Sequence, residues 1–208
     1  MTSPELPELP PGAFARIDEG DDAEFYLPPR LVTHIDDQAI AALADFYGSV
    51  LPPNGVLLDL MSSWVSHLPA DFAVAEMVGH GMNARELAAN PRLTRWFIQD
   101  LNRESALPLE DAGFDGALCC VSVQYLQQPL AVFAEIRRVL KPGAPFIVSF
   151  SNRCFPTKAV AIWRALDLRR HAALVRLYFE RSGFSPIEVR VLADGSYSDP
   201  LIAVIGRA

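Results

Sequence analysis

Short apolar runs alternate with amphipathic segments from residue 56 onward, and this alternation limits the possible folds more than any other feature of the sequence. Continuous apolar runs of about five residues are typical of strands buried on both faces, and amphipathic segments between them are typical of helices that cover a sheet. We expect strands over residues 56–60, 72–79, 96–99, 114–121 and 146–150. Strands that alternate with helices in this way predict a parallel sheet with helices on both faces.

The last part of the chain predicts a different strand pairing. Apolar and polar residues alternate over residues 187–191, a turn follows at Asp194-Gly195, and residues 201–205 form a final apolar run. Because a short turn can join only antiparallel strands, we expect these two strands to form an antiparallel pair. The predicted fold class is therefore α/β, with a doubly wound, mostly parallel seven-stranded sheet and an antiparallel C-terminal strand pair.

Helices are predicted between these strands and also in front of them. They are expected over residues 83–90, 129–140, 157–168 and 170–181, the last closed by Gly183 as a C-cap. A further helix is expected to begin at Thr33, because Asp36 follows it in a capping-box spacing. Prolines exclude a long helix in front of it, so we divide the chain into a Pro-rich arm, residues 1–32, and one domain, residues 33–208. Residues 25–27 of the arm are expected to pack back onto the domain.

Charge and composition exclude several classes of function. The formal net charge is −7, which repels a phosphate backbone and makes nucleic acid a poor substrate. No apolar run is long enough to span a membrane, and the N-terminus lacks the apolar core of a signal peptide. Three cysteines without a metal-binding spacing predict no metal site and a reducing compartment. We therefore expect a cytoplasmic protein.

Two sequence runs carry a resemblance to a known family. LPLEDAGFD at residues 107–115 and EIRRVLKPG at residues 135–143 resemble motifs of the class I S-adenosylmethionine-dependent methyltransferases, type 11-like. The second run ends a helix and turns the chain into the next strand, so it is specific for the fold rather than for an activity. The resemblance implies a Rossmann-like fold, S-adenosyl-L-methionine as cofactor, and in-line methyl transfer to a small, soluble, neutral or cationic molecule.

The first cofactor loop departs from the family pattern. In the family, an acidic residue precedes a Gly-x-Gly pattern that lets the backbone approach the methionine moiety of the cofactor. This chain keeps the acid as Asp59 but continues with Met61, Ser62, Ser63 and Trp64. The resemblance implies cofactor contacts at Asp59, Met61, Ser62 and Ser63, with a serine capping a following helix near the cofactor carboxylate. The alternative is a purely structural N-cap with Trp64 packed beneath it.

The remaining cofactor loops are expected to follow the next three strands. Gly79 and Gly81 would allow close backbone approach to a ligand, but no acid stands at the position that binds the ribose in the family. Asn83 either accepts a ribose hydrogen bond or caps the next helix. Asp100 is expected to accept the adenine amino group, beside the backbone of Leu101. Other expected contacts are Met82 and, beside the transferred methyl, Ser122.

Methyl transfer from a sulfonium needs orientation and, for some acceptors, a base. The candidates for a base or an acceptor-orienting group are His34, His67, His80 and Tyr125, although a lone histidine is more often structural. The candidates for substrate contacts are Tyr26 and Arg30 in the arm, and Asn152 and Arg153 behind the fifth strand. His34 is placed in the first helix, and His80 in the cofactor loop.

Three functions compete on this evidence. The first is a methyltransferase that acts on a small molecule. The second is a non-catalytic methyltransferase-like module that has lost or altered cofactor binding and binds a partner protein or a different ligand in the cleft. A homodimer or a protein partner is an open expectation for the chain in either case. The third, a nicotinamide-dependent reductase, is excluded because no Gly-x-Gly-x-x-Gly follows the first strand.

Overall fold

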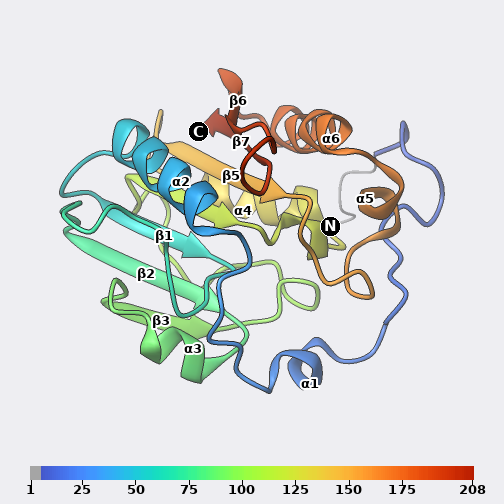
Figure 1. The fold of residues 1–208 in the computed structure, drawn as a ribbon, viewed down its shortest axis with the longest axis horizontal. Helices are drawn as coiled ribbons and strands as arrows, with labels where there is room; N and C mark the ends of the chain where they lie inside the picture. Colours follow the sequence, from blue (N-terminus) through green and yellow to red (C-terminus); the bar gives the residue numbers. More distant parts are fainter. Residues whose placement is uncertain (1–5) are drawn as a thin grey trace.

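The structure is a computed structural model that describes residues 6–208, and one mixed sheet organises it (Figure 1). The sheet has seven strands in the order β3-β2-β1-β4-β5-β7-β6. Its strands are β1 (Val56–Leu60), β2 (Glu76–Gly81), β3 (Arg95–Ile98), β4 (Gly116–Cys120), β5 (Pro145–Ser151), β6 (Ile187–Ala193) and β7 (Leu201–Arg207). Strands β1 to β5 are parallel, and β7 runs antiparallel to both β5 and β6. The predicted fold class is confirmed.

Helices cover both faces of the sheet, with α2 in front of it and α4 behind it in Figure 1. The helices are α1 (Asp22–Tyr26), α2 (Asp37–Val50), α3 (Ala84–Ala89), α4 (Pro129–Val139), α5 (Ala161–Ala165) and α6 (Leu168–Arg181), with a 3₁₀ turn, η1, at Val123–Tyr125. Alternate residues of each strand point to opposite faces. Leu57 therefore packs in the cluster with Tyr47 of α2, and Leu58 packs in the cluster with Phe133 of α4.

The run at residues 135–143 has the structural role that the sequence predicts. Helix α4 ends at Val139, and Gly143 adopts φ +80°, a conformation in which a residue with a side chain would be strained. Strand β5 then begins at Pro145. Gly183, at φ +81°, likewise follows the end of α6, as expected for a C-cap glycine.

Three expectations about local structure are wrong. The helix expected from Thr33 begins instead at Asp37, with Asp36 as N-cap accepting the Ala39 N–H at 2.9 Å, so His34 lies in the loop before it. Residues 72–75 are not a strand, because β2 begins at Glu76, where it pairs with the start of β1. No helix follows β1 among the described residues, although a serine there was expected to cap one. After β1, Pro69 stands in the middle of the connection and would break a helix there.

The arm lies along the domain rather than away from it. Its backbone bonds to the segment before α5, for example from Asp18 N–H to Thr157 O at 2.9 Å and from Ala161 N–H to Ala15 O at 2.8 Å. Phe25 packs edge-on against Phe155 at 5.5 Å, as the sequence predicts, whereas Leu27 is 74% exposed. Residues 1–5 of the predicted arm lie outside the described residues. No helix in the described part of the chain is long and apolar enough to cross a membrane.

Candidate functional site

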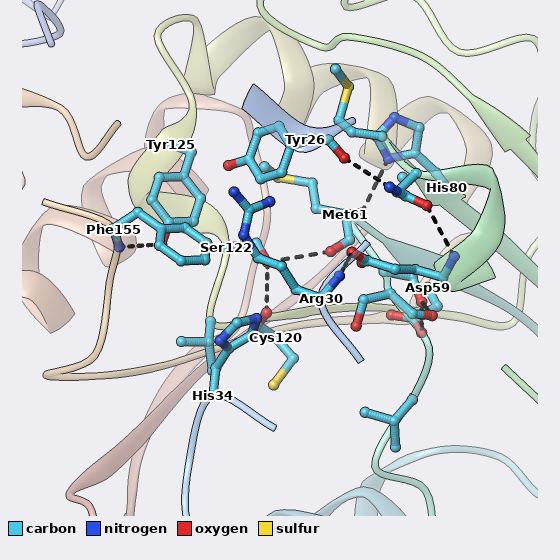
Figure 2. Close-up of a pocket in the computed structure, with 18 of the residues that line it drawn as sticks. Tyr26, Arg30, His34, Asp59, Met61, His80, Cys120, Ser122, Tyr125 and Phe155 are labelled. Atoms are coloured by element: carbon cyan, nitrogen blue, oxygen red, sulfur yellow. Dashed lines mark hydrogen bonds between the residues drawn. The ribbon is translucent and has the colours of Figure 1, made fainter. Parts of the chain in front are cut away.

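A cavity of about 570 Å³ opens at the carboxyl ends of the parallel strands and is bordered by the arm (Figure 2). This is the edge of an open parallel sheet at which ligands bind. The predicted site residues that line it are Tyr26, Arg30, His34, Asp59, Met61, Ser62, Ser63, His67, His80, Gly81, Met82, Asn83, Asp100, Leu101, Ser122, Tyr125 and Arg153. Gly79 and Asn152 do not line it. Residues far apart in the sequence therefore meet at the predicted place.

Asp59 stands at the end of β1 with its carboxylate buried in the cavity wall. Its Oδ2 accepts hydrogen bonds from the hydroxyls of Ser62 and Ser66, each at 2.6 Å. No cation pairs with it among residues 6–208, and burial raises its pKa to about 6. The hydroxyl bonds oppose this rise and hold the side chain in place. The site thus holds a carboxylate that has no positive partner within the described protein.

The loop after β1 contains no glycine, and hydrogen bonds to His80 of β2 hold its conformation. Met61 adopts φ +55°, and its N–H donates to Nδ1 of His80 at 3.1 Å. The N–H of Ser62 donates to the carbonyl of His80 at 2.7 Å. A Cβ on Gly81 would lie 2.6 Å from the carbonyl oxygen of Ser62, so Gly81 makes room for this loop. Ser62 and Ser63 cap no helix, which corrects that prediction.

Gly79 is structural, contrary to the sequence prediction, and His80 has a structural role although it also lines the cavity. Both lie inside β2. His80 is buried, and its second ring nitrogen, Nε2, donates to the carbonyl of Gln99 at 2.9 Å. Burial lowers its pKa to about 4, so the neutral ring links the ends of β1, β2 and β3 and has no nitrogen left for catalysis. A Cβ on Gly79 would lie 2.4 Å from Leu93, so this glycine serves packing rather than ligand approach.

Asn83 caps α3 and also holds the arm. Its amide oxygen accepts the N–H groups of Arg85 and Glu86, and its amide nitrogen donates to the carbonyls of Tyr26 and Leu27 at 2.8 and 3.0 Å. All its hydrogen-bonding capacity is therefore used, and a ribose contact would require one of these bonds to break.

Glu86, on the first turn of α3, is a site residue that the sequence reasoning missed. Its carboxylate lines the cavity beside the end of β2 and accepts the backbone N–H of Arg30 at 2.6 Å. Burial raises its pKa, and the Arg30 N–H and charge oppose the rise. Its position three residues after Asn83 was the signal available in the sequence, since an acid there completes an N-terminal cap.

Asp100 and Leu101 lie behind β3, at the opposite end of the cavity from β5. Asp100 Oδ1 accepts the N–H of Asn102 at 2.9 Å, and its Oδ2 lies 3.5 Å from Arg103. Leu101 is buried beside it. Asp100 therefore shapes the turn after β3 and also lines the cavity.

Tyr125 and Ser122 follow β4. The Tyr125 hydroxyl oxygen accepts the N–H of Phe155 at 2.8 Å, and the two rings stack at 5.9 Å. Burial raises the pKa of Tyr125 to about 12, so this phenol stays protonated near neutral pH and cannot act as a base, which corrects that part of its predicted role. The Ser122 hydroxyl donates to the carbonyl of Cys120 at 2.7 Å.

Two histidines remain near the mouth of the cavity. His34 packs edge-on against Phe155 at 5.4 Å. Partial burial and the charge of Arg30 lower its pKa, so it is neutral near pH 7. Burial lowers the pKa of His67 to about 4, and its Nδ1 has no partner in the described protein. Both rings are uncharged near pH 7 and line the cavity, and His34 is exposed whereas His67 is half-buried.

The two predicted substrate residues that follow β5 in the sequence provide no unpaired charge for a ligand. Arg153 pairs with Asp199 at 2.8 Å, and Asn152 is exposed outside the cavity. In the arm, by contrast, Tyr26 and Arg30 both face the cavity. The arm therefore places Tyr26 and Arg30 on the cavity wall, and the segment after β5 places Phe155 there.

Residues 64–148 match the protein family described as Methyltransferase domain. The matched segment runs from the loop behind β1 into β5 and lies within a sheet of the order found in this family. Residues 64–148 of the chain are thus similar to a methyltransferase domain, and the fold around them is that of the class I S-adenosylmethionine-dependent methyltransferases. Asp59 itself lies just outside the matched segment.

Individual comparisons place the methyltransferase fold across most of the chain. A structure of the complex between the Haloferax volcanii Trm112 methyltransferase activator and a methyltransferase superposes with a TM-score of 0.63 at 15% identity, covering 83% of this chain and 90% of that one. The Haemonchus contortus phosphoethanolamine N-methyltransferase 2, in complex with S-adenosyl-L-methionine, superposes with a TM-score of 0.58 at 13% identity, covering 82% and 52%.

A curated relative matches only a short segment of the chain. Over 76 residues the chain is 33% identical to the biotin biosynthesis bifunctional protein BioHC of Teredinibacter turnerae. That segment is 36% of this chain and 13% of the relative. Such similarities show a methyltransferase-like segment and the fold, and the methyl acceptor is not determined by them.

Proposed function

We propose that this methyltransferase binds S-adenosyl-L-methionine in the cavity and transfers its methyl group to a small soluble molecule. The observation that carries the proposal is Asp59, a buried carboxylate with no cation beside it at the end of β1. A buried charge of this kind is costly unless something compensates it. The ammonium group of the cofactor is a cation of the right sign, and the family places its methionine moiety at this strand.

The other side chains fit the cofactor in the order of the strands. Since β3, β2, β1 and β4 are neighbours, their ends offer Asp100, Glu86, Asp59 and Ser122 in a row. Asp100 beside Leu101 suits the adenine. Glu86 supplies the carboxylate for the ribose diol that the end of β2 lacks. We assign this ribose role to Glu86 rather than to Asn83, whose amide is already engaged.

The bound cofactor supplies an activated methyl group, and the protein supplies position. Tyr26 and Arg30 of the arm border the cavity and limit the access of water to it. Tyr125 keeps its proton and orients the acceptor through its O–H and its ring. For an acceptor that must lose a proton, His34 is the group that takes it, since its ring is neutral and faces the cavity.

Calorimetric titration with S-adenosylhomocysteine tests the proposal. We expect binding at micromolar concentration by the wild-type protein. Asp59→Asn should weaken it by about 1.5–3 kcal/mol, the value of a hydrogen bond to a charged group. Asp45→Asn, on the exposed face of α2 outside the cavity, is the matched control and should leave the affinity unchanged. No heat at millimolar ligand with folded wild-type protein would contradict the proposal.

One observation favours the alternative, a methyltransferase-like module without cofactor. The backbone N–H groups of Met61 and Ser62, in the loop where the family binds the methionine moiety, are both bonded to His80. They are not available to a ligand unless the loop moves. The same titration separates the two functions, because the module would bind neither S-adenosylhomocysteine nor S-adenosylmethionine.

A further inference from the structure

We propose that the Arg30 guanidinium is the recognition group for a carboxylate on the methyl acceptor, at the end of the cavity that lies beside β5. The inference rests on the proposed function, because it assumes that the cofactor occupies the other end. It also changes the expected class of acceptor, which we had expected to be neutral or cationic.

The guanidinium of Arg30 is held among aromatic rings with one donor unused. Its carbon lies 4.6 Å from the ring centre of Phe25, 5.1 Å from that of Phe155 and 5.8 Å from that of Tyr26. Nη2 donates to the carbonyl of Phe25 at 3.0 Å, whereas Nη1 has no hydrogen-bond partner in the described protein. Figure 2 shows the side chain reaching toward Tyr26, Tyr125 and Phe155. A ligand oxygen would satisfy the unused donor.

Arg30 differs from Arg153, the other cation that lines this half of the cavity, because Arg153 is already paired. Asp36, the N-cap of α2, also lines the cavity and forms no ion pair within the described residues. Arg153 pairs with Asp199, and Asp22 pairs with Arg16 and Lys158. Arg30 forms no ion pair within residues 6–208. Glu86 accepts its backbone N–H, but the guanidinium extends away from that bond toward Phe155. The positive charge of Arg30 is thus available to a ligand.

The two ends of the cavity therefore differ in charge. Asp100, Glu86 and Asp59 belong to the half formed by β3, β2 and β1. Phe155 and the guanidinium of Arg30 belong to the half beyond β4. A cofactor that carries a sulfonium and an ammonium suits the acidic half. A planar carboxylate suits a guanidinium, which binds it through parallel N–H donors.

The main rival is that Arg30 binds the carboxylate of the cofactor itself. Both ligands carry the same group, so the test must measure them separately. We would titrate the protein with benzoate, with neutral benzamide and with S-adenosylhomocysteine, and we would compare the wild type with Arg30→Met. Arg176→Met, an exposed arginine of α6 outside the cavity, is the matched control. Arg30→Lys keeps the positive charge but lacks the planar pair of N–H donors that a guanidinium presents to a carboxylate.

The proposal predicts that wild-type protein binds benzoate at millimolar concentration and binds benzamide about tenfold more weakly or worse. Arg30→Met should lose about tenfold or more in benzoate affinity and keep its S-adenosylhomocysteine affinity, and Arg30→Lys should fall between. Retained cofactor affinity also shows that the variant is folded.

Three results would overturn the proposal: no benzoate binding by the wild type, equal benzoate binding by wild type and Arg30→Met, or a loss of S-adenosylhomocysteine affinity as large as the loss for benzoate. If S-adenosylhomocysteine fails to bind at all while benzoate binding still depends on Arg30, the proposed function fails and the carboxylate site stands.

Discussion

Asp22 and Asp59 are two buried aspartates that line the same cavity, yet their surroundings are opposite. Asp22 accepts bonds from Arg16 at 2.7 and 2.8 Å and lies 2.9 Å from the fully buried ammonium of Lys158. Burial alone would raise its pKa, but the bonds from Arg16 and Lys158 outweigh burial and lower it. The Asp59 carboxylate accepts hydrogen bonds from two serine hydroxyls and has no cation beside it in the described protein, and burial raises its pKa to about 6.

The ion pairs of Asp22 and their absence at Asp59 distinguish a carboxylate with a structural role from one that is available to a ligand. The charge of Asp22 is neutralised inside the protein, where it joins the arm to the segment before α5 and, through Asn102 at 3.1 Å, to the turn after β3. The charge of Asp59 is neutralised by nothing in the described protein. A carboxylate left in this state at the end of a parallel strand is typical of a functional site rather than of a stabilising contact.

The largest expected effect comes from breaking the Asp22 network. Asp22→Asn leaves Lys158 buried without its nearest carboxylate and should lower the free energy of unfolding by about 3–5 kcal/mol. Urea unfolding at pH 7 measures it. The double variant Asp22→Asn, Lys158→Met should recover part of the loss, because the stranded charge is gone. A loss below about 1 kcal/mol would show that the network does not stabilise the fold.

The pH dependence of stability should have opposite signs at the two aspartates. Asp59 has a pKa of about 6 in the folded state, above its value in the unfolded chain, so the native state binds more protons. The contribution of Asp59 to the free energy of unfolding is therefore lost as the pH rises from about 4 to 6. The expected loss is about 3 kcal/mol. Asp22 has a lowered pKa, so its contribution is lost instead as the pH falls below about 4.

The measurement for Asp59 is a difference between two proteins. The pKa values of His67 and His80 are lowered to about 4 in the folded state, so these histidines make the protein less stable as the pH falls. This pH dependence is opposite to the one expected from Asp59. Subtracting the unfolding free energy of Asp59→Asn from that of the wild type at each pH cancels both histidines. We expect this difference to fall between pH 4 and 7, and a flat difference would show that the Asp59 pKa is not raised.

The fold was predictable from the sequence because buried strands leave a periodic apolar pattern. The runs at residues 56–60 and 146–150 match β1 and most of β5, and the last two strands pair as the turn between them requires. The placement of β2 was not predictable, because Phe72 and Val74 are apolar while the strand is set by its pairing with β1. That shift moved His80 from a loop into the sheet and Gly79 from the end of a strand into its interior.

The site was predictable where it depends on strand ends and not where it depends on side-chain bonds. Asp59 lies in the last two residues of β1, Asp100 follows the end of β3, and both line the cavity. The engagement of Asn83 with the arm and the bonds of His80 to a neighbouring loop join residues far apart in the sequence. Glu86 was missed because helix α3 brings it back to the cavity one turn after β2 ends.

The central claim is that the Asp59 carboxylate is kept for a cation of the ligand. Near pH 6 it should be about half protonated without ligand, and a bound ammonium should ionise it and release about half a proton. Titration with S-adenosylhomocysteine at pH 6, in two buffers of different ionisation enthalpy, measures that release. The account predicts buffer-dependent heat for the wild type and none for Asp59→Asn. Binding without proton release, or with equal release by both proteins, would contradict it.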